Sequence, residues 1–141
     1  MKPIYIFSLI ILFTTACQQE EGVMKDAKLF TLLYPKDTGV DFRNDLEETF
    51  KVNLMTNEYM YSGGGVAVGD INKDWLQDLY FVSNQGQDKL YLNKGNFKFE
   101  DITAKAGIEF VSGWSAGVTM EDVNSDGHLD IYVVRGGEYE K

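Results

Sequence analysis

The chain has 141 residues, with 13 Lys and Arg against 22 Asp and Glu, one His, one Cys and 14 Gly. This length allows one ordinary domain, and a single Cys excludes a disulfide framework and a Cys-rich zinc site. A net charge of −9 argues against nucleic-acid binding, which needs a basic face. The apolar share of 44% is too high for a disordered acidic chain. Because there are 14 Gly and only 2 Pro, tight turns and β structure are favoured over long helices.

The first 16 residues are typical of a signal peptide. Lys2 precedes a ten-residue apolar run, residues 4–13 (IYIFSLIILF). The run is shorter than the roughly 20 residues that span a bilayer, and it has the length of a signal-peptide core. Small residues then lead to Cys17, an order that resembles the lipobox of bacterial lipoproteins, although Thr14 stands where that motif usually has Leu. The sequence therefore predicts a signal peptide over 1–16 and a lipidated Cys17; the alternative is an ordinary secretory signal with an incidental Cys.

The polar stretch that follows Cys17 predicts a flexible tether over residues 17–27. Its acidic residues resemble the surface-export signals of some Gram-negative lipoproteins, and a plain solvated spacer is the alternative reading. We therefore expect a protein that is anchored by lipid to the outer membrane or cell surface, with residues 28–141 forming the folded part.

An internal repeat organises the folded part. A shift of 52 positions aligns segment 64–82 (GGVAVGDINKDWLQDLYFV) with segment 116–134 (AGVTMEDVNSDGHLDIYVV), and eight of the 19 aligned pairs are identical. Periods of about 20–50 residues indicate solenoids, propellers or arrays, and the long period here suits propeller blades. The sequence thus predicts at least two copies of one structural unit.

Each copy has short β-rich runs around a polar loop, and one copy with its linker predicts four antiparallel strands, which is the content of one propeller blade. A hairpin turn at 93–96 and a turn at 104–107 complete the unit. Upstream, the sequence predicts further strands at 28–33 and 52–55 and a helix at 45–50. The predicted fold class is all-β, an incomplete propeller of about two blades. The predicted strands in and between the copies are 65–68, 79–82, 89–92, 97–102, 117–120 and 131–134.

The chemistry is concentrated in two loops with the pattern Asp-x-Asn-x-Asp-x-x-x-Asp. Alternate oxygen side chains in a tight loop converge on one point, and calcium takes six to eight oxygens, one usually from a backbone carbonyl. Position seven would supply that carbonyl. This is no EF-hand, because position twelve holds an apolar residue instead of Glu. The sequence predicts two calcium sites; the alternative is Asp/Asn-rich turns without metal. The predicted ligands are Asp70, Asn72, Asp74, Leu76 and Asp78 in one loop and Asp122, Asn124, Asp126, His128 and Asp130 in the other.

The loops, with GGGVAVGD before the first, resemble FG-GAP/VCBS repeats, the calcium-bearing blades of integrin α-subunit propellers. Residues 89–107 (KLYLNKGNFKFEDITAKAG) are similar to the inter-loop part of bacterial VCBS proteins with ASPIC/UnbV domains, relatives of cartilage acidic protein. The resemblance implies a β-propeller at a surface, with calcium on the ten residues named above, acting in adhesion or recognition of an unknown protein or glycan ligand.

Two features depart from that family. Trp75 stands where the family, like Gly127 here, has glycine, so the first site is expected to be weaker or Trp75 to serve as a partner contact. A closed propeller needs roughly four to eight blades, so we expect the N-terminal piece of a longer protein or a truncated gene product. The predicted function is a calcium-binding adhesion module and not an enzyme. The alternative is an accessory part of a larger carbohydrate-active or other surface enzyme whose catalytic domain lies beyond residue 141.

Overall fold

The computed structural model of the chain describes residues 28–109 and 113–136. The chain divides into two compact units, residues 1–32 and 33–141, and both sheets below belong to the second. The predicted signal peptide, the lipidated Cys17 and the tether lie outside the described residues. Within the described part, the structure contains no helix of the length and apolarity that crossing a bilayer requires.

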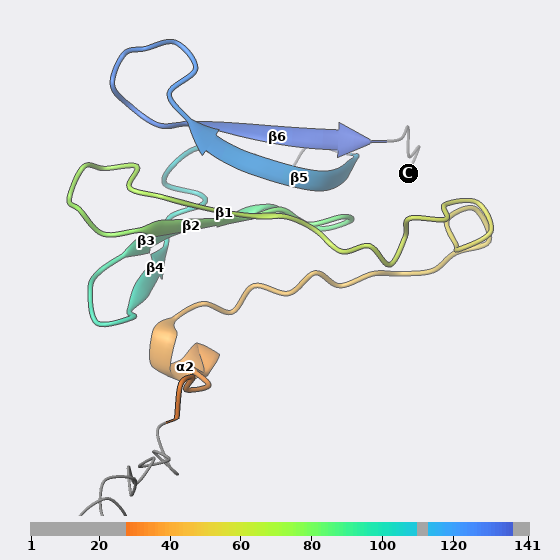
Figure 1. The fold of residues 1–141 in the computed structure, drawn as a ribbon. Coiled ribbons are helices and arrows are strands. Elements are labelled where there is room, and N and C mark those ends of the chain that lie inside the picture. Colours follow the sequence, from red (N-terminus) through yellow and green to blue (C-terminus); the bar gives the residue numbers. More distant parts are fainter. Residues whose placement is uncertain (1–27, 110–112, 137–141) are drawn as a thin grey trace, which may run out of the picture. The chain divides into compact units, whose positions relative to one another are not determined.

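The first copy of the repeat forms a complete four-stranded antiparallel sheet (Figure 1). Its strands are β1 (Val66–Gly69), β2 (Asp78–Phe81), β3 (Lys89–Asn93) and β4 (Phe99–Asp101), and they pair in chain order. Each connection is short, so consecutive strands become neighbours. The prediction of one four-stranded blade is confirmed.

The second copy contributes a two-stranded antiparallel sheet, β5 (Trp114–Glu121) and β6 (Asp130–Gly136). A register shift between Ser115 and Gly117 marks a β-bulge near the start of β5. In the described residues the fold is therefore almost entirely β, one complete propeller-like blade and one hairpin, which confirms the predicted fold class.

The core lies between the two sheets. On the first sheet, Ala67, Tyr80 and Leu90 are paired neighbours across β1, β2 and β3, and they share one buried face with Val82. Side chains of the second sheet pack against this face. The backbones approach closely here: a Cβ on Gly65 would lie 3.0 Å from the Cα of Gly117, so glycine permits the contact. The packed residues of the second sheet are Val118, Met120, Ile131 and Val133.

A segment before the first copy crosses the opposite face of the first sheet. It follows the short helix α2 (Pro35–Thr38), and we call residues 39–48 the strap. The Tyr91 hydroxyl donates to Asp41 Oδ1 at 2.7 Å, and the Phe42 ring stacks on Phe81 with 4.9 Å between centroids. The predicted helix at 45–50 is wrong. Glu47, within this range, instead bonds to the connection between β2 and β3, where Gln85 Oε1 accepts the Glu47 N–H at 2.6 Å.

Other predictions in the connecting segments are also corrected. Residues 28–33 and 52–55 form no strand. At 52–55 the side chain of Asn53 ends the extended backbone, because its Oδ1 accepts the Met55 N–H at 2.9 Å and its Nδ2 donates to Phe50 O. The strand predicted from residue 97 begins at Phe99, since Phe97 has a φ of 56° and belongs to the turn between β3 and β4. The predicted turn at 104–107 is present, and the hairpin turn predicted at 93–96 lies one to two residues later, at 94–98, because Asn93 still belongs to β3.

Candidate metal centre

The first acidic loop, residues 70–78, joins β1 to β2 and is held closed by its own side chains. Asp70 accepts two backbone N–H groups, that of Asp74 at 3.1 Å and that of Trp75 at 2.7 Å. Asn72 Oδ1 also accepts the Asp74 N–H, and Asp74 Oδ1 accepts the Leu76 N–H. Each side chain oxygen therefore bonds a backbone group two to five residues ahead, which forces a tight turn.

The second acidic loop, residues 122–130, joins β5 to β6 and repeats this arrangement bond for bond. Asp122 accepts the N–H groups of Asp126 at 3.1 Å and Gly127 at 2.8 Å. Asn124 Oδ1 accepts the Asp126 N–H at 2.9 Å, and Asp126 Oδ1 accepts the His128 N–H at 2.8 Å. In both loops the amide of the Asn donates to the next Asp. The sequence repeat is thus also a repeat of local geometry.

These bonds stabilise the ionised form of the central carboxylates. The Asn72 amide and the Leu76 N–H hold the pKa of Asp74 below its ordinary value. In the second loop the His128 N–H and the Asn124 amide do the same for the pKa of Asp126. Both groups therefore carry a negative charge at neutral pH.

The donor chemistry of each loop fits a hard dication. Three carboxylates and the carbonyl oxygen of one amide offer oxygen ligands, and a carboxylate has about four lone-pair sites, of which the loop bonds use some. In the described conformation no three Asp, Glu, His or Cys side chains of residues 28–109 and 113–136 are gathered closely enough to hold an ion. The structure therefore places the ten sequence-predicted ligands in two matched loops, but it does not bring their carboxylates together around one point as the sequence predicts.

Position six takes the same backbone conformation in both loops. Gly127 has a φ of 81° and Trp75 a φ of 69°, both in the left-handed region. Position four is also left-handed, at Lys73 and Ser125. Since Trp carries a Cβ, the first loop stores strain that the second avoids, about 1–2 kcal/mol. The Trp75 side chain is 91% exposed at the loop surface.

The last Asp of each loop differs in its surroundings. Asp78 is fully buried, and its two oxygens accept the N–H of Ile71 at 3.0 Å and that of Asn93 on β3 at 2.7 Å. Asp130 accepts the N–H of Val123 at 3.1 Å and is only half-buried. The third strand of the first copy thus encloses one end of its loop.

The two loops lie beside each other. Lys73 Nζ of the first loop is 3.4 Å from His128 Nε2 of the second, and a Cβ on Gly127 would lie 3.8 Å from the same nitrogen. The ammonium group adds a positive charge next to the second loop, where it contributes to the lowered pKa of Asp126.

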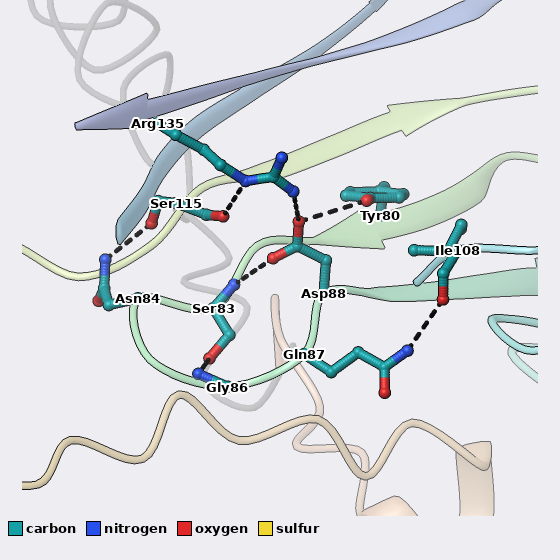
Figure 2. A network of polar contacts seen from close by, with 9 residues as sticks. All are labelled: Tyr80, Ser83, Asn84, Gly86, Gln87, Asp88, Ile108, Ser115 and Arg135. Carbon is teal, nitrogen blue, oxygen red and sulfur yellow. Dashed lines mark hydrogen bonds and ion pairs between the residues drawn. The ribbon is translucent and has the colours of Figure 1, made fainter. Parts of the chain in front are cut away.

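A buried polar network joins the two copies through the β2–β3 connection, and the sequence analysis missed it (Figure 2). Asp88 accepts the Ser83 N–H at 2.9 Å and pairs with Arg135 Nη2 of β6 at 3.3 Å. Burial, together with the charge of Asp88, raises the pKa of Tyr80 to about 12. Asn84 Nδ2 donates to Ser115 O of β5 at 2.8 Å. The only sequence signal of this network is the turn-rich run SNQGQD at 83–88, which does not indicate that its side chains are buried.

The comparisons with known proteins agree with this geometry. Residues 70–133 match the FG-GAP-like repeat family. This match begins at the first Asp of the first loop and ends inside β6, so it covers both loops and the strands between them. The recognised part of the chain is therefore the part that carries the repeat.

Individual proteins match a longer stretch of the chain than the family does. It is 38% identical over 72 residues to cartilage acidic protein 1 of Xenopus tropicalis and 36% identical over 72 residues to the Homo sapiens protein, in each case 50% of this chain and 11% of the relative. It is 34% identical over 110 residues to integrin alpha-8 of Gallus gallus, 67% of this chain and 10% of the relative. The chain thus spans about a tenth of the length of these relatives. No solved structure matches it.

Proposed function

We propose that the two acidic loops each bind one calcium ion. The observation that carries this proposal is the duplicated donor set: two loops, 52 residues apart, share the same oxygen side chains and the same pattern of hydrogen bonds. A solvated turn needs neither three carboxylates nor a second identical copy. In the first loop the ligands are Asp70, Asn72, Asp74, Asp78 and the Leu76 carbonyl, and in the second Asp122, Asn124, Asp126, Asp130 and the His128 carbonyl.

A bound cation supplies positive charge that offsets three like charges per loop. The chain's own residues do the positioning. Asp70 and Asp122 fix the turn through the N–H groups of residues five and six of each loop. Asp78 and Asp130 fix its closing end. The hydrogen bonds therefore fix the turn of each loop, and binding an ion requires the carboxylates to move closer together within that turn.

We further propose that this calcium-bearing repeat unit acts in adhesion or recognition at a cell surface, held there by a lipidated Cys17 of the bacterial lipoprotein type. The match to the FG-GAP-like repeat family and the similarity to an integrin α-subunit support recognition. The apolar run before Cys17 supports the anchor. Calcium has a structural role in this proposal and takes no part in turnover.

Calcium binding is tested by titration calorimetry of the full chain, with Trp75 as a luminescence donor for terbium at the first loop. We expect two sites. Asp74→Ala should remove one and abolish most sensitised terbium emission, while Asp126→Ala should remove the other and leave that emission in place. Ser125→Ala, in the second loop but outside the donor set, serves as the matched control. A wild-type chain that binds no calcium at millimolar concentration would exclude the proposal.

The anchor is tested separately by expressing the chain and its Cys17→Ser variant in a Gram-negative host. The wild type should carry added lipid mass and sediment with membranes, and the variant should be released into the soluble fraction. If the variant stays in the membrane fraction and the wild type carries no lipid, Cys17 is not the anchor, and the calcium sites are unaffected by that result.

A further inference from the structure

The first sheet ends in two exposed turns, and each turn presents an aromatic side chain. Trp75 lies in the loop between β1 and β2 and is 91% exposed, and Phe97 lies in the turn between β3 and β4 and is 67% exposed. Because neighbouring strands run in opposite directions, both connections leave the same end of the sheet (Figure 1). We call residues 73–76 and 94–98 the aromatic tip.

Hydrogen bonds from one residue join the two turns of the tip. The Asn93 side chain donates to Gln77 O at 2.8 Å, and the Asn93 N–H donates to Asp78 Oδ1 at 2.7 Å. Asn93 Oδ1 also accepts the Gly95 N–H at 2.8 Å, which shapes the turn that carries Phe97. The two aromatic residues therefore stand on one connected support at the end of the strands, and not on the sheet face through which the two copies pack.

Both aromatic residues occupy backbone conformations that favour glycine. The φ angle is 69° at Trp75 and 56° at Phe97. The second acidic loop makes the same turn with Gly127 at the position of Trp75, so the turn itself does not require an aromatic residue. A ring that is 91% exposed contributes little packing to the fold, and strain of this kind concentrates at binding sites. These observations indicate that the rings serve an external contact.

The charges around the rings depend on calcium. The first acidic loop and the β3–β4 turn together contain Lys73, Lys94 and Lys98 and an equal number of carboxylates, so one bound dication makes them net positive. The second acidic loop adds three carboxylates and no Lys or Arg, and with two bound ions the whole set is again net positive. Lys94 also lies 3.6 Å from Glu100 of β4, but both side chains are about half exposed, so another anion can compete for the ammonium.

We propose that the aromatic tip binds an anionic phospholipid bilayer when the acidic loops hold calcium. Exposed Trp and Phe side chains favour the headgroup region, and Lys side chains are attracted to lipid phosphates. A bilayer fits better than a glycan or a peptide, because a ring that is 91% exposed protrudes and lines no cavity that would enclose a small ligand. Without calcium, the chain's net charge of −9 repels an anionic surface. The calcium dependence rests on the function proposed above.

The test uses the full chain with Cys17→Ser, so that a lipid cannot act as the anchor, and vesicles of phosphatidylcholine mixed with phosphatidylglycerol. We expect the chain to sediment with these vesicles in calcium, and its tryptophan emission to shift to shorter wavelength. Trp75 reports this shift, because the other tryptophan, Trp114, is only 6% exposed before any vesicle is added. A chelator should reverse both changes, and vesicles of phosphatidylcholine alone should bind more weakly.

Three variants test the residues of the tip. Trp75→Ala keeps the strained backbone and removes the ring, so it should weaken vesicle binding by about tenfold or more while calorimetry still detects both calcium sites. Lys94→Gln should weaken binding to the anionic vesicles about fivefold and leave binding to the neutral vesicles unchanged. Phe50→Ala is the matched control, because Phe50 is 98% exposed and lies outside the tip; this variant should bind like the unsubstituted tip.

The outcomes separate this proposal from calcium binding itself. A chain that binds calcium by calorimetry and stays off the vesicles at every lipid concentration overturns the proposal and leaves the calcium sites standing. Equal vesicle binding in calcium and in chelator, or an equal loss in Phe50→Ala and Trp75→Ala, also overturns it. If calorimetry detects no calcium binding, the proposed function fails and this proposal fails with it. A shift of the emission with dextran and not with vesicles would assign the tip to a glycan instead.

Discussion

The two acidic loops have the same internal hydrogen bonds and different surroundings. Each closes through its own Asp and Asn side chains, and each reaches the left-handed region at positions four and six. The first loop then leads into a four-stranded sheet whose third strand buries Asp78, whereas the second leads into a hairpin with Asp130 half-exposed. The comparison shows that local side chains set the turn, and that neighbouring strands set how deeply its last carboxylate is buried.

Calcium should stabilise the second loop more than the first, because the strained backbone at Trp75 opposes binding only at the first site. At a hundredfold excess over Kd, one site adds about 2.7 kcal/mol to the free energy of unfolding. We expect calcium to raise the melting temperature by several degrees and a chelator to reverse the rise. Asp126→Ala should remove a larger part of the rise than Asp74→Ala. Identical melting with calcium and with chelator would show that the ions have no structural role.

Removing the last carboxylate of each loop tests the effect of burial without metal. Asp78→Ala leaves the N–H groups of Ile71 and Asn93 without their acceptor, and each unsatisfied buried donor costs about 1–3 kcal/mol. We expect a loss of about 2–4 kcal/mol, measured by urea unfolding in the presence of a chelator. Asp130→Ala should cost less than about 1 kcal/mol, since water can reach Val123. Equal losses at the two positions would contradict a role for β3.

Exchanging the residues at position six tests the strain argument. Trp75→Gly relieves about 1–2 kcal/mol of backbone strain and adds about 0.5–1 kcal/mol of unfolded-state entropy, so a net gain of up to about 1 kcal/mol is expected. Gly127→Ala should destabilise by about 1 kcal/mol, because it introduces a Cβ at a φ of 81°. Thermal melts of the two variants in chelator measure both. A Trp75→Gly variant that melts below the wild type would mean that Trp75 is stabilised by contacts of its side chain.

The smallest expected effect is the pH dependence of the ion pair between Lys89 on β3 and Asp101 on β4. Among the described residues only the first copy has these two strands. Burial tends to raise the pKa of Asp101, but the Lys89 ammonium at 2.6 Å and Thr103 lower it on balance. A lowered folded-state pKa contributes stability above about pH 4, and this contribution disappears as the pH falls through that lowered pKa. Lys89→Met should therefore cost less than about 1 kcal/mol at pH 7 and have little effect near pH 2. A cost that is the same at both pH values would assign it to packing.

The sequence predicted best what is determined locally or by the repeat. The four strands of the first copy and the turns of the acidic loops follow from β-rich runs and from Asp and Asn spacing. The helix predicted at 45–50 was wrong because its environment is long-range: Glu47 pairs with Gln85. Burial of Asn84 and Asp88 was missed for the same reason, since both are satisfied by residues of the distant second copy.

The strap has a consequence for how the chain folds. Its contacts join residues far apart in sequence, as in the bond between Tyr91 and Asp41, which are 50 positions apart. Closing so large a loop costs entropy before any contact repays it, so strap docking belongs to the late, slow part of folding. During synthesis Asp41 of the strap leaves the ribosome 50 residues before Tyr91 of β3. At 5–20 residues per second this delay is about 3–10 s. During that interval the Phe42 ring cannot yet stack on Phe81. A chaperone that binds exposed aromatic segments could therefore bind this part of the nascent chain.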